Sequence, residues 1–310
     1  MPSFVNNGIF IAILAHGLIG LSLIWDKILL ERPETRNVVN YIFWLGAMSI
    51  LGVCLVPFGF TMPARGVFAI AFGAGLVQLA ANYFYYDALD AGEASQTLAI
   101  MGGFSPLFTY LIGVALLKKP LGGASMVGFG IMVAGGFFMF LSEALNVKRV
   151  LPLTIAASGM FGLSSVMQKL AFDRTNFVSA YVVFTIGTFA GALILLIRPS
   201  WRDQILHTSE EASPRSKELY FVNRFISGVG SFLIFFAISR ASPAIVDAIS
   251  GVRYVLVFVG VYFVGKYHPR WLKEEYRGWP LEAKIIATAL VVAGLVLVGL
   301  SGQGGAQGPS

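Results

Sequence analysis

Apolar residues form long runs that recur along nearly the whole chain and are separated by short polar segments. Each run approaches the roughly 20 residues that an α-helix needs to cross the hydrocarbon core of a bilayer. Proline breaks the pattern between runs, for example at Pro33, Pro63, Pro120 and Pro199. Polar and apolar positions do not alternate as they do in a membrane β-barrel. The pattern therefore predicts an all-α integral membrane protein.

Ten transmembrane helices are expected, near residues 7–30, 38–58, 66–88, 93–117, 122–142, 151–172, 177–197, 218–239, 244–265 and 283–301. Two longer loops are expected at 198–217 and 266–282, and a flexible tail at 302–310. The first run has no basic segment before it. We therefore interpret it as a retained helix and not as a cleaved signal.

The same pattern is written twice in the chain. Residues 17–27 and 159–169 match at an offset of 142, in the pairs Gly17/Gly159, Gly20/Gly162, Leu21/Leu163, Ser22/Ser164 and Lys27/Lys169. Later matches occur at offsets of 150 (Ala91/Ala241) and 159 (Gly135/Gly294), and the offset grows where the second half has its longer loops. These matches predict two five-helix repeats, 1–147 and 148–301. Since five is odd, the second repeat is inverted in the membrane.

Composition agrees with this class and excludes others. The chain is 56% hydrophobic and 12% charged, well below the charge of a soluble domain. Its net charge of +6 comes from basic residues that lie mostly in loops, which suits lipid headgroups and gives no support for nucleic-acid binding. The single cysteine, Cys54, lies in an apolar run and excludes a disulfide framework. We expect no cofactor and no metal site.

The loops that follow the first, third, fifth, seventh and ninth helices carry most of the loop Lys and Arg. The positive-inside rule assigns these loops to the cytoplasm. An even number of spans then leaves both termini on the same, outer side. We expect a multi-pass protein of the bacterial inner (plasma) membrane kind.

One segment carries a family resemblance. Residues 85–94 read Tyr-Tyr-Asp-Ala-Leu-Asp-Ala-Gly-Glu-Ala, and Pro106 and a Gly-rich fifth helix follow. This arrangement resembles the EamA-type repeat of the drug/metabolite transporter (DMT) superfamily. The resemblance implies ten helices, export or exchange of small metabolites, and termini in the cytoplasm, against the charge count. The chain departs from the family where many repeats end their fourth helix with Gly-Glu, since Lys118-Lys119 stands there.

Charged residues inside the expected spans are the first candidates for substrate binding. Arg253 lies near the middle of the ninth span, where facing lipid costs about 2.5–3.5 kcal/mol. It is expected to face a wet cavity or to form a structural pair with Asp247, although six positions along a helix point the two to different faces. Arg224 either reaches the headgroups or adds a second cation to the cavity. With Asp247 as the one expected counter-charge, an anionic or zwitterionic substrate is favoured.

Uncharged polar residues complete the predicted substrate site. Gln78, Asn82 and Tyr86 follow helical spacing on the third span, so they either line the cavity or form interhelical hydrogen bonds. His16 is either a proton relay or a buried histidine whose hydrogen bonds are satisfied. Tyr254 is a candidate aromatic wall.

The repeated motif supplies candidate gates. Lys27 and Lys169 are either ordinary basic flanks at helix ends or gate residues at opposite mouths. Ser22 and Ser164 either bond to their own helices or belong to the same gates. Gly102, Gly103 and Pro106 either allow close packing or form a hinge in the fourth span.

Three function classes remain open. The leading hypothesis is a secondary transporter of a small polar metabolite such as an amino acid, an organic acid or a phosphate, working by alternating access with proton or counter-substrate coupling. A P-loop motif, which ATP-driven transport would need, is absent from the sequence. The alternative is a flippase that moves a membrane lipid with an anionic headgroup, and a membrane-embedded enzyme is a weaker third.

Overall fold

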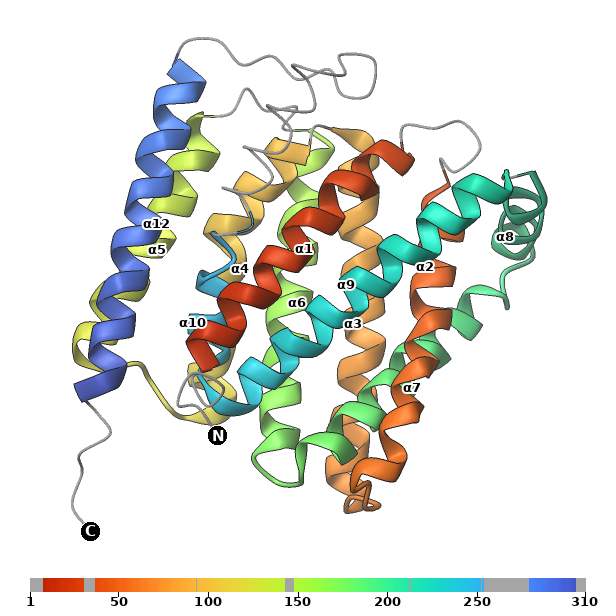
Figure 1. The fold of residues 1–310 in the computed structure, drawn as a ribbon, viewed down its shortest axis with the longest axis horizontal. Coiled ribbons are helices and arrows are strands. Elements are labelled where there is room, and N and C mark those ends of the chain that lie inside the picture. Colours follow the sequence, from red (N-terminus) through yellow and green to blue (C-terminus); the bar gives the residue numbers. More distant parts are fainter. Residues whose placement is uncertain are drawn as a thin grey trace.

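The computed structural model describes residues 8–30, 37–92, 94–142, 148–211, 213–251, 253 and 279–304. In this part of the chain all regular structure is helical (Figure 1). Most of the expected ninth span, with Tyr254, lies outside the described residues, and so does residue range 305–310 of the expected tail.

The helices are α1 (Gly8–Leu30), α2 (Val38–Met48), η2 (Ser49–Phe58), α3 (Arg65–Ala91), α4 (Ala94–Leu117), α5 (Gly123–Ser142), α6 (Val150–Phe172), α7 (Phe177–Leu195), α8 (Pro199–Glu211), α9 (Pro214–Arg240), α10 (Pro243–Ala248) and α12 (Trp279–Gly304). Within the described residues, 7 helical segments are long and apolar enough to cross a membrane. They comprise α1, α2 with η2, α3, α4, α6, α7 and α9, while α5 and α12 contain shorter apolar stretches. The chain is an all-α, multi-span membrane protein.

Local sequence signals set several helix starts. Asn37 precedes α2, and its side chain accepts a hydrogen bond from the Asn40 amide at 2.9 Å. Asn176 accepts in the same way from the Ser179 amide at 2.8 Å before α7. Such caps satisfy amide groups that the first helical turn leaves unpaired. They explain why these polar residues end the loops that precede each span.

The second span keeps its predicted bounds, 38–58, although it continues as a 3-10 helix from Ser49, and Pro57 inside it has no amide hydrogen to donate. Two other predictions need correction. The expected loop 198–217 contains α8, which begins with Pro199, a residue suited to the first helical position. The last helix extends to Gly304, three residues into the expected tail.

The ninth span is interrupted where the sequence pattern predicted a continuous helix. Helix α10 ends at Ala248, and two of the backbone bonds that follow join residues three apart. The Ser250 amide donates to the Asp247 carbonyl at 3.0 Å, and the Arg253 amide donates to the Ser250 carbonyl at 2.9 Å. A tighter winding changes the angle between successive side chains. Asp247 and Arg253, which the sequence pattern placed on different helix faces, both line the cavity described below.

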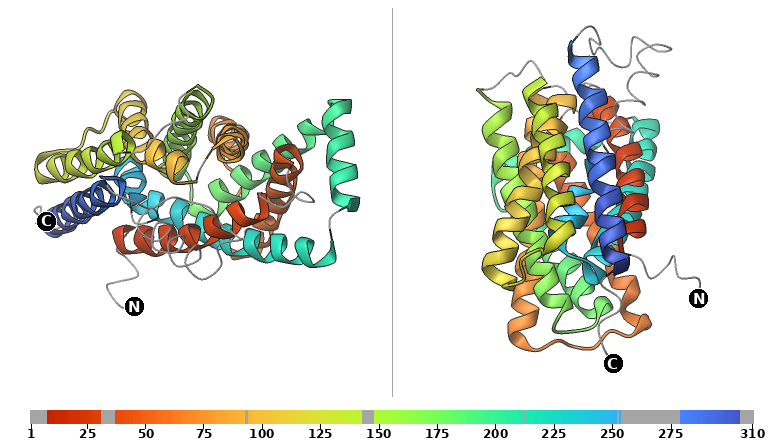
Figure 2. Two further views of the ribbon diagram at one scale, coloured as in Figure 1. Left: turned by 90° about the horizontal axis from the view of Figure 1, so that it is seen from above. Right: turned by 90° about the vertical axis from the view of Figure 1, so that its left-hand side faces the viewer.

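The long helices cross the bundle from one end to the other, several of them strongly tilted (Figure 1), so the bundle has two ends. We call them the α1–α2 end, where α1 finishes and α2 begins, and the α6–α7 end, where α6 finishes and α7 begins. Helices α5 and α12 lie side by side at one edge (Figure 2), and α1 packs against α9 on another side. The start of α1 and the finish of α12 lie at the same end (Figure 1).

Close helix packing depends on glycine in the middle of the bundle. Helices α3 and α7 meet at Gly75 and Gly187, where a Cβ on Gly75 would lie 2.6 Å from the Thr188 amide nitrogen. A Cβ on Gly187 would lie 2.9 Å from the Phe72 carbonyl carbon. No side chain fits between backbones at this distance. The contact brings Thr185 and Thr188 of α7 next to the polar face of α3.

Candidate functional site

A cavity of about 530 Å³ lies inside the bundle. Its walls come from α1, α2 with η2, α3, α4, α6, α7, α9 and α10, so residues from both halves of the chain share it. The volume falls in the range of roughly 300–1,000 Å³ that small-molecule sites occupy. Seven of the eight predicted substrate residues line it, namely His16, Gln78, Asn82, Tyr86, Arg224, Asp247 and Arg253.

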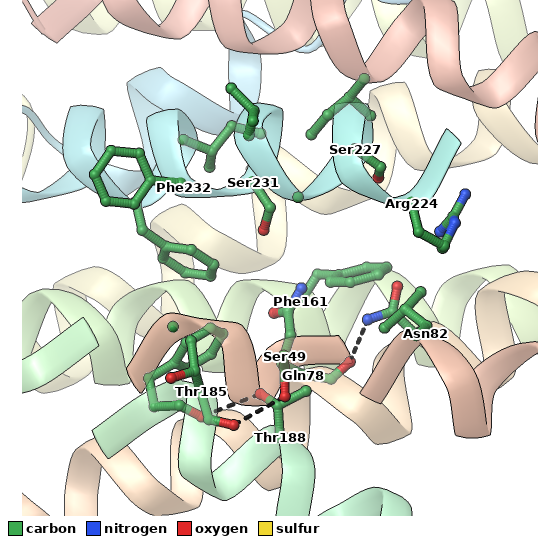
Figure 3. A pocket seen from close by; sticks show the side chains of 18 of the residues that line it. Ser49, Gln78, Asn82, Phe161, Thr185, Thr188, Arg224, Ser227, Ser231 and Phe232 are labelled. Atoms are coloured by element: carbon green, nitrogen blue, oxygen red, sulfur yellow. Dashed lines mark hydrogen bonds between the residues drawn. The ribbon is translucent and has the colours of Figure 1, made fainter. Parts of the chain in front are cut away.

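Helix α9 presents a polar stripe to this cavity (Figure 3). Arg224, Ser227 and Ser231 are spaced three and four residues apart, so they share one face of the helix. The sequence analysis identified Arg224 and missed the two serines, although the same helical spacing relates them. Small hydroxyl residues carried too weak a signal in an apolar run.

A second polar wall faces α9 from α3 and α7 (Figure 3). The Asn82 side-chain amide donates to the Gln78 carbonyl at 2.9 Å, and the Thr188 hydroxyl donates to the Phe184 carbonyl at 3.1 Å. Ser49 of η2 donates to the Thr185 carbonyl at 2.9 Å. These bonds satisfy helix carbonyls and leave the hydroxyl oxygens as acceptors toward the cavity.

At the α1–α2 end, Arg224 forms a buried ion pair with Asp26 of α1. The side chains of Arg224 and Asp26 are only 3% and 1% exposed. Tyr41 and Tyr86 donate to the Asp26 carboxylate at 2.6 and 2.8 Å. Asn223 also donates to this carboxylate. Every described contact of the Asp26 carboxylate is thus a hydrogen-bond donor, which is what a buried charge requires.

Aromatic rings surround the same guanidinium. Its central carbon lies 5.2, 5.8 and 5.6 Å from the ring centres of Tyr41, Tyr86 and Tyr220. The Tyr86 hydroxyl accepts from Arg224 Nη1 at 2.9 Å. The three ring faces add cation–π attraction to the ion pair. We call Asp26, Tyr41, Tyr86, Asn223 and Arg224 the Arg224 network.

This network corrects two expectations. Arg224 does not reach toward the headgroups, because its charge is paired inside the bundle. Asp247 is not the one counter-charge, because Asp26 neutralises Arg224. Asp26 was overlooked because it precedes Lys27 near a helix end and looked like part of a polar flank. A carboxylate within an apolar run is costly, as an arginine is, so Asp26 is a candidate functional residue on the same grounds.

A second polar cluster lies on the α10 side of the cavity. His16 Nε2 donates to the Val246 carbonyl at 2.8 Å, so Nδ1 is left to accept from Arg253 Nη2 at 2.9 Å. Asp247 accepts a hydrogen bond from Thr109 of α4. Arg253 Nε has no hydrogen-bond partner among the described residues. The cluster therefore offers a cation and an anion to the cavity side by side.

The remaining wall is apolar and reaches the outer surface of the bundle. Leu51 of η2 and Phe225 and Val229 of α9 line the cavity, yet they are 55%, 64% and 40% exposed. Helices α2 and α9 touch nearer the α1–α2 end, where the rings of Trp44 and Phe221 lie 5.7 Å apart. Farther from the α1–α2 end than this contact, the exposed lining residues indicate that the cavity opens sideways between η2 and α9.

The predicted gate and hinge residues that the structure describes in full do not line the cavity. Lys169 forms an ion pair with Asp173 at 3.0 Å and donates to the Ser239 carbonyl at 3.1 Å, which ties α6 to the last turn of α9. Ser164 donates across helices to the Ala74 carbonyl at 2.9 Å. Ser22 is buried, and its hydroxyl has no hydrogen-bond partner among the described residues. The side chain of Lys27 lies outside the described residues.

Helix α4 is continuous through the predicted hinge. Gly103 packs on the Phe137 ring of α5, with 3.1 Å to a Cβ built there, and Gly102 meets the backbone of Gly136. These contacts use the absence of a side chain for close packing. A bend at Pro106 stays a prediction.

In the described part of the chain, no group of three His, Cys, Asp or Glu side chains is arranged to hold a metal ion. The site consists of ion pairs, hydroxyl groups and aromatic walls around a cavity in the membrane-spanning region. A site of this kind can hold a small polar solute. Fold and site together are those of a multi-span membrane protein with an internal cavity.

Comparison with known proteins finds a family match for the first half of the chain. Residues 6–141 match the EamA-like transporter family and form an EamA-type domain of the DMT superfamily. This is a family of transporters and not of enzymes. A crystal structure of another protein, 16% identical in sequence, covers 99% of this chain and 99% of its own chain with a TM-score of 0.65, which shows a shared fold. No curated protein matches the sequence.

Proposed function

We propose that this EamA-type transporter carries a small zwitterionic or anionic metabolite, such as an amino acid or an organic acid, by alternating access. The observation that supports it best is the pair of opposite charges on the α10 side of the cavity. Arg253 and Asp247 both line the cavity, and Arg253 Nε lacks a hydrogen-bond partner among the described residues. A substrate carboxylate would bind Arg253, and a substrate ammonium group would bind Asp247.

Charge balance favours a zwitterion over a dianion. Asp26 already neutralises Arg224, so the substrate meets one arginine and one aspartate. A dianion would place an excess negative charge beside Asp247, which is costly where water is excluded. The hydroxyl groups of Ser227, Ser231 and Thr188 would bind the polar remainder, and the apolar wall would contact the substrate side chain.

We further propose that the two halves, 1–147 and 148–301, are inverted five-helix repeats of a ten-span transporter. The α5–α12 contact supports this. Gly135 and Gly294 are equivalent at the offset of 159, and so are Gly128 and Ala287. A Cβ on Gly135 would lie 2.9 Å from the Ala287 carbonyl, and one on Gly294 would lie 2.6 Å from the Gly128 carbonyl. Reciprocal contacts of this kind are what a two-fold axis between the halves would produce.

Other helix pairs obey the same symmetry. If α1 and α9 correspond to α6 and α3, both pairs should pack closely, and both do. The self-related pair α2–α7 also packs together. An inverted arrangement lets the halves rock about the central cavity, with energy drawn from a proton or counter-substrate gradient. Lys27 and Lys169, with Ser22 and Ser164, would then lie at opposite mouths.

The basic residues favour one orientation in a plasma membrane. Arg149, Arg198 and Arg202 all lie at the α1–α2 end, which we propose faces the cytoplasm, so both termini lie outside. Protease cleavage of a tag on either terminus in sealed cells tests this. Cleavage from outside supports the orientation, and protection in intact cells reverses it.

Ligand binding to purified protein tests the substrate class. A thermal-shift screen compares amino acids, dicarboxylates, sugar phosphates and polyamines, since a ligand that binds the folded state raises Tm. We expect amino acids to raise Tm in wild type and not in Arg253→Ala or Asp247→Asn. Stabilisation by polyamines or dicarboxylates alone would contradict the zwitterion.

The opening between η2 and α9 favours a second candidate, a flippase. A lipid headgroup would enter the cavity through this apolar opening while its chains stayed in the bilayer. A fluorescent-lipid translocation assay in proteoliposomes separates the candidates. Lipid translocation without amino-acid transport would support the flippase and exclude the metabolite transporter.

A further inference from the structure

The Arg224 network joins four helices at one end of the bundle. Asp26 lies on α1, Tyr41 on α2 and Tyr86 on α3, and all three contact Arg224 of α9. Asp26 and Arg224 belong to opposite halves of the chain. Any motion that separates the halves at this end must break their ion pair. The network is also sealed, because both side chains are almost fully buried.

The equivalent positions in the other half carry no charge. At the offset of 142, Asp26 corresponds to Gln168 of α6. At the offset of 150, Arg224 corresponds to Ala74 and Tyr86 to Phe236. Gln168 is fully buried, and neither polar atom of its amide has a hydrogen-bond partner among the described residues. The positions that form the Arg224 network in one half are thus occupied by uncharged side chains in the other half.

At the α6–α7 end the cavity is closed by aromatic packing. The Phe177 ring of α7 lies 5.4 Å from that of Phe232 and 5.2 Å from that of Phe236, both of α9. Tyr181 lies 5.3 Å from Phe232 and lines the cavity with it. Apolar contacts of this kind are non-directional, so they separate and re-form without leaving a charge unpaired.

We propose that the Asp26–Arg224 pair is the lock that closes the α1–α2 end of the cavity, while the aromatic contact of α7 with α9 closes the α6–α7 end. This rests on the proposed transport function and adds the residues that gate it. Opening the α1–α2 end parts two charges in a medium of low dielectric constant, which is costly unless both find new partners.

Side-specific labelling of a cysteine in the cavity tests the lock. The reporter is Ser165→Cys of α6, which lines the cavity, in a chain whose own cysteine is replaced by Cys54→Ser. A membrane-impermeant methanethiosulfonate reagent is applied to right-side-out and to inside-out vesicles. The labelling rate from each face measures how often that end opens.

The neutral pair Asp26→Asn with Arg224→Gln removes both charges together, so no buried ion is left unpaired. We expect labelling from the α1–α2 face to become faster by about tenfold or more, which corresponds to about 1.4 kcal/mol. Labelling from the α6–α7 face should stay within about twofold, well below a tenfold change, because the aromatic contact that closes this end is unaltered. Phe232→Ala should produce the reverse, and the exchanged pair Asp26→Arg with Arg224→Asp should restore slow labelling.

Gln168→Leu is the matched control at the repeat-equivalent position, and it should change neither rate. Tyr86→Phe removes one donor from the lock and keeps the ring, so it remains a test if the pair variants fail to fold. The lock is overturned if either variant of the network leaves labelling from the α1–α2 face unchanged, or speeds it equally from both faces. These rates require no substrate, so failure of the transport proposal gives a separate result.

Discussion

Asp26 and Gln168 correspond at the offset of 142 between the two proposed repeats, yet their replacement should have opposite effects on stability. Asp26→Asn retains the shape of the side chain and removes its charge, which leaves the Arg224 guanidinium buried without a counter-ion. Gln168→Leu replaces an amide that makes no described hydrogen bond with an apolar group of similar size. Comparison of the two variants separates the contribution of the ion pair to stability from the effect of burying a polar side chain.

The expected magnitude follows from burial. The Arg224 and Asp26 side chains are 3% and 1% exposed, so water does little to screen the lost charge. Breaking a buried pair by removal of one partner costs about 3–5 kcal/mol. An unsatisfied buried amide costs about 1–3 kcal/mol, so Gln168→Leu should leave stability unchanged or raise it by up to that amount.

Reversible unfolding in mixed micelles, followed by circular dichroism, measures both changes. We also expect the double variant Asp26→Asn with Arg224→Gln to be more stable than Asp26→Asn alone, because it leaves no unpaired ion. The reasoning is refuted if Asp26→Asn unfolds as wild type does, or if Gln168→Leu is the more damaging of the two.

Three further predictions concern packing, capping and exposure. Gly75→Ala should lose about 1–3 kcal/mol because its Cβ would meet the α7 backbone, whereas Gly228→Ala, with no atom within 4 Å of the new Cβ, should be neutral or gain up to about 1 kcal/mol; thermal unfolding compares them. Asn176→Ala removes the cap of α7 and should lower stability by about 0.5–2 kcal/mol, and an Asn176→Asp variant that behaves like the alanine would contradict the cap. Cys54 is exposed on an apolar span and belongs to the cavity wall that reaches the outer surface, so a lipid-soluble maleimide should label it faster in proteoliposomes than a charged one, and equal rates would contradict exposure to lipid.

The sequence contained the outline of the fold because its signals are local. Apolar runs, prolines and caps such as Asn37 and Asn176 mark where spans begin, and the apolar requirement of the bilayer makes these signals strong. The end of α10 at Ala248 was not predicted, because residues 247–250 contain no proline or glycine that would signal the end of a helix. Helix α8 was not predicted because its polar composition is that of a loop.

The candidate site was predicted in part for a related reason. Arg253, His16 and Gln78 were identified because polar groups inside spans are rare and costly. Their partners come from distant segments, as in the contact of His16 with Arg253, and no local pattern predicts such pairs. Asp26 was missed because its role depends on Arg224, nearly 200 positions away along the chain.

Counterflow in proteoliposomes tests the central claim most directly. Vesicles loaded with an unlabelled amino acid that stabilises the purified protein are diluted into the same amino acid at trace level in labelled form. A secondary transporter with its site between the halves should accumulate the label in wild-type vesicles. Folded Arg253→Ala vesicles should take up no more label than empty liposomes. Equal uptake by wild type and Arg253→Ala, or no uptake by wild type of any ligand that stabilises it, would contradict the account.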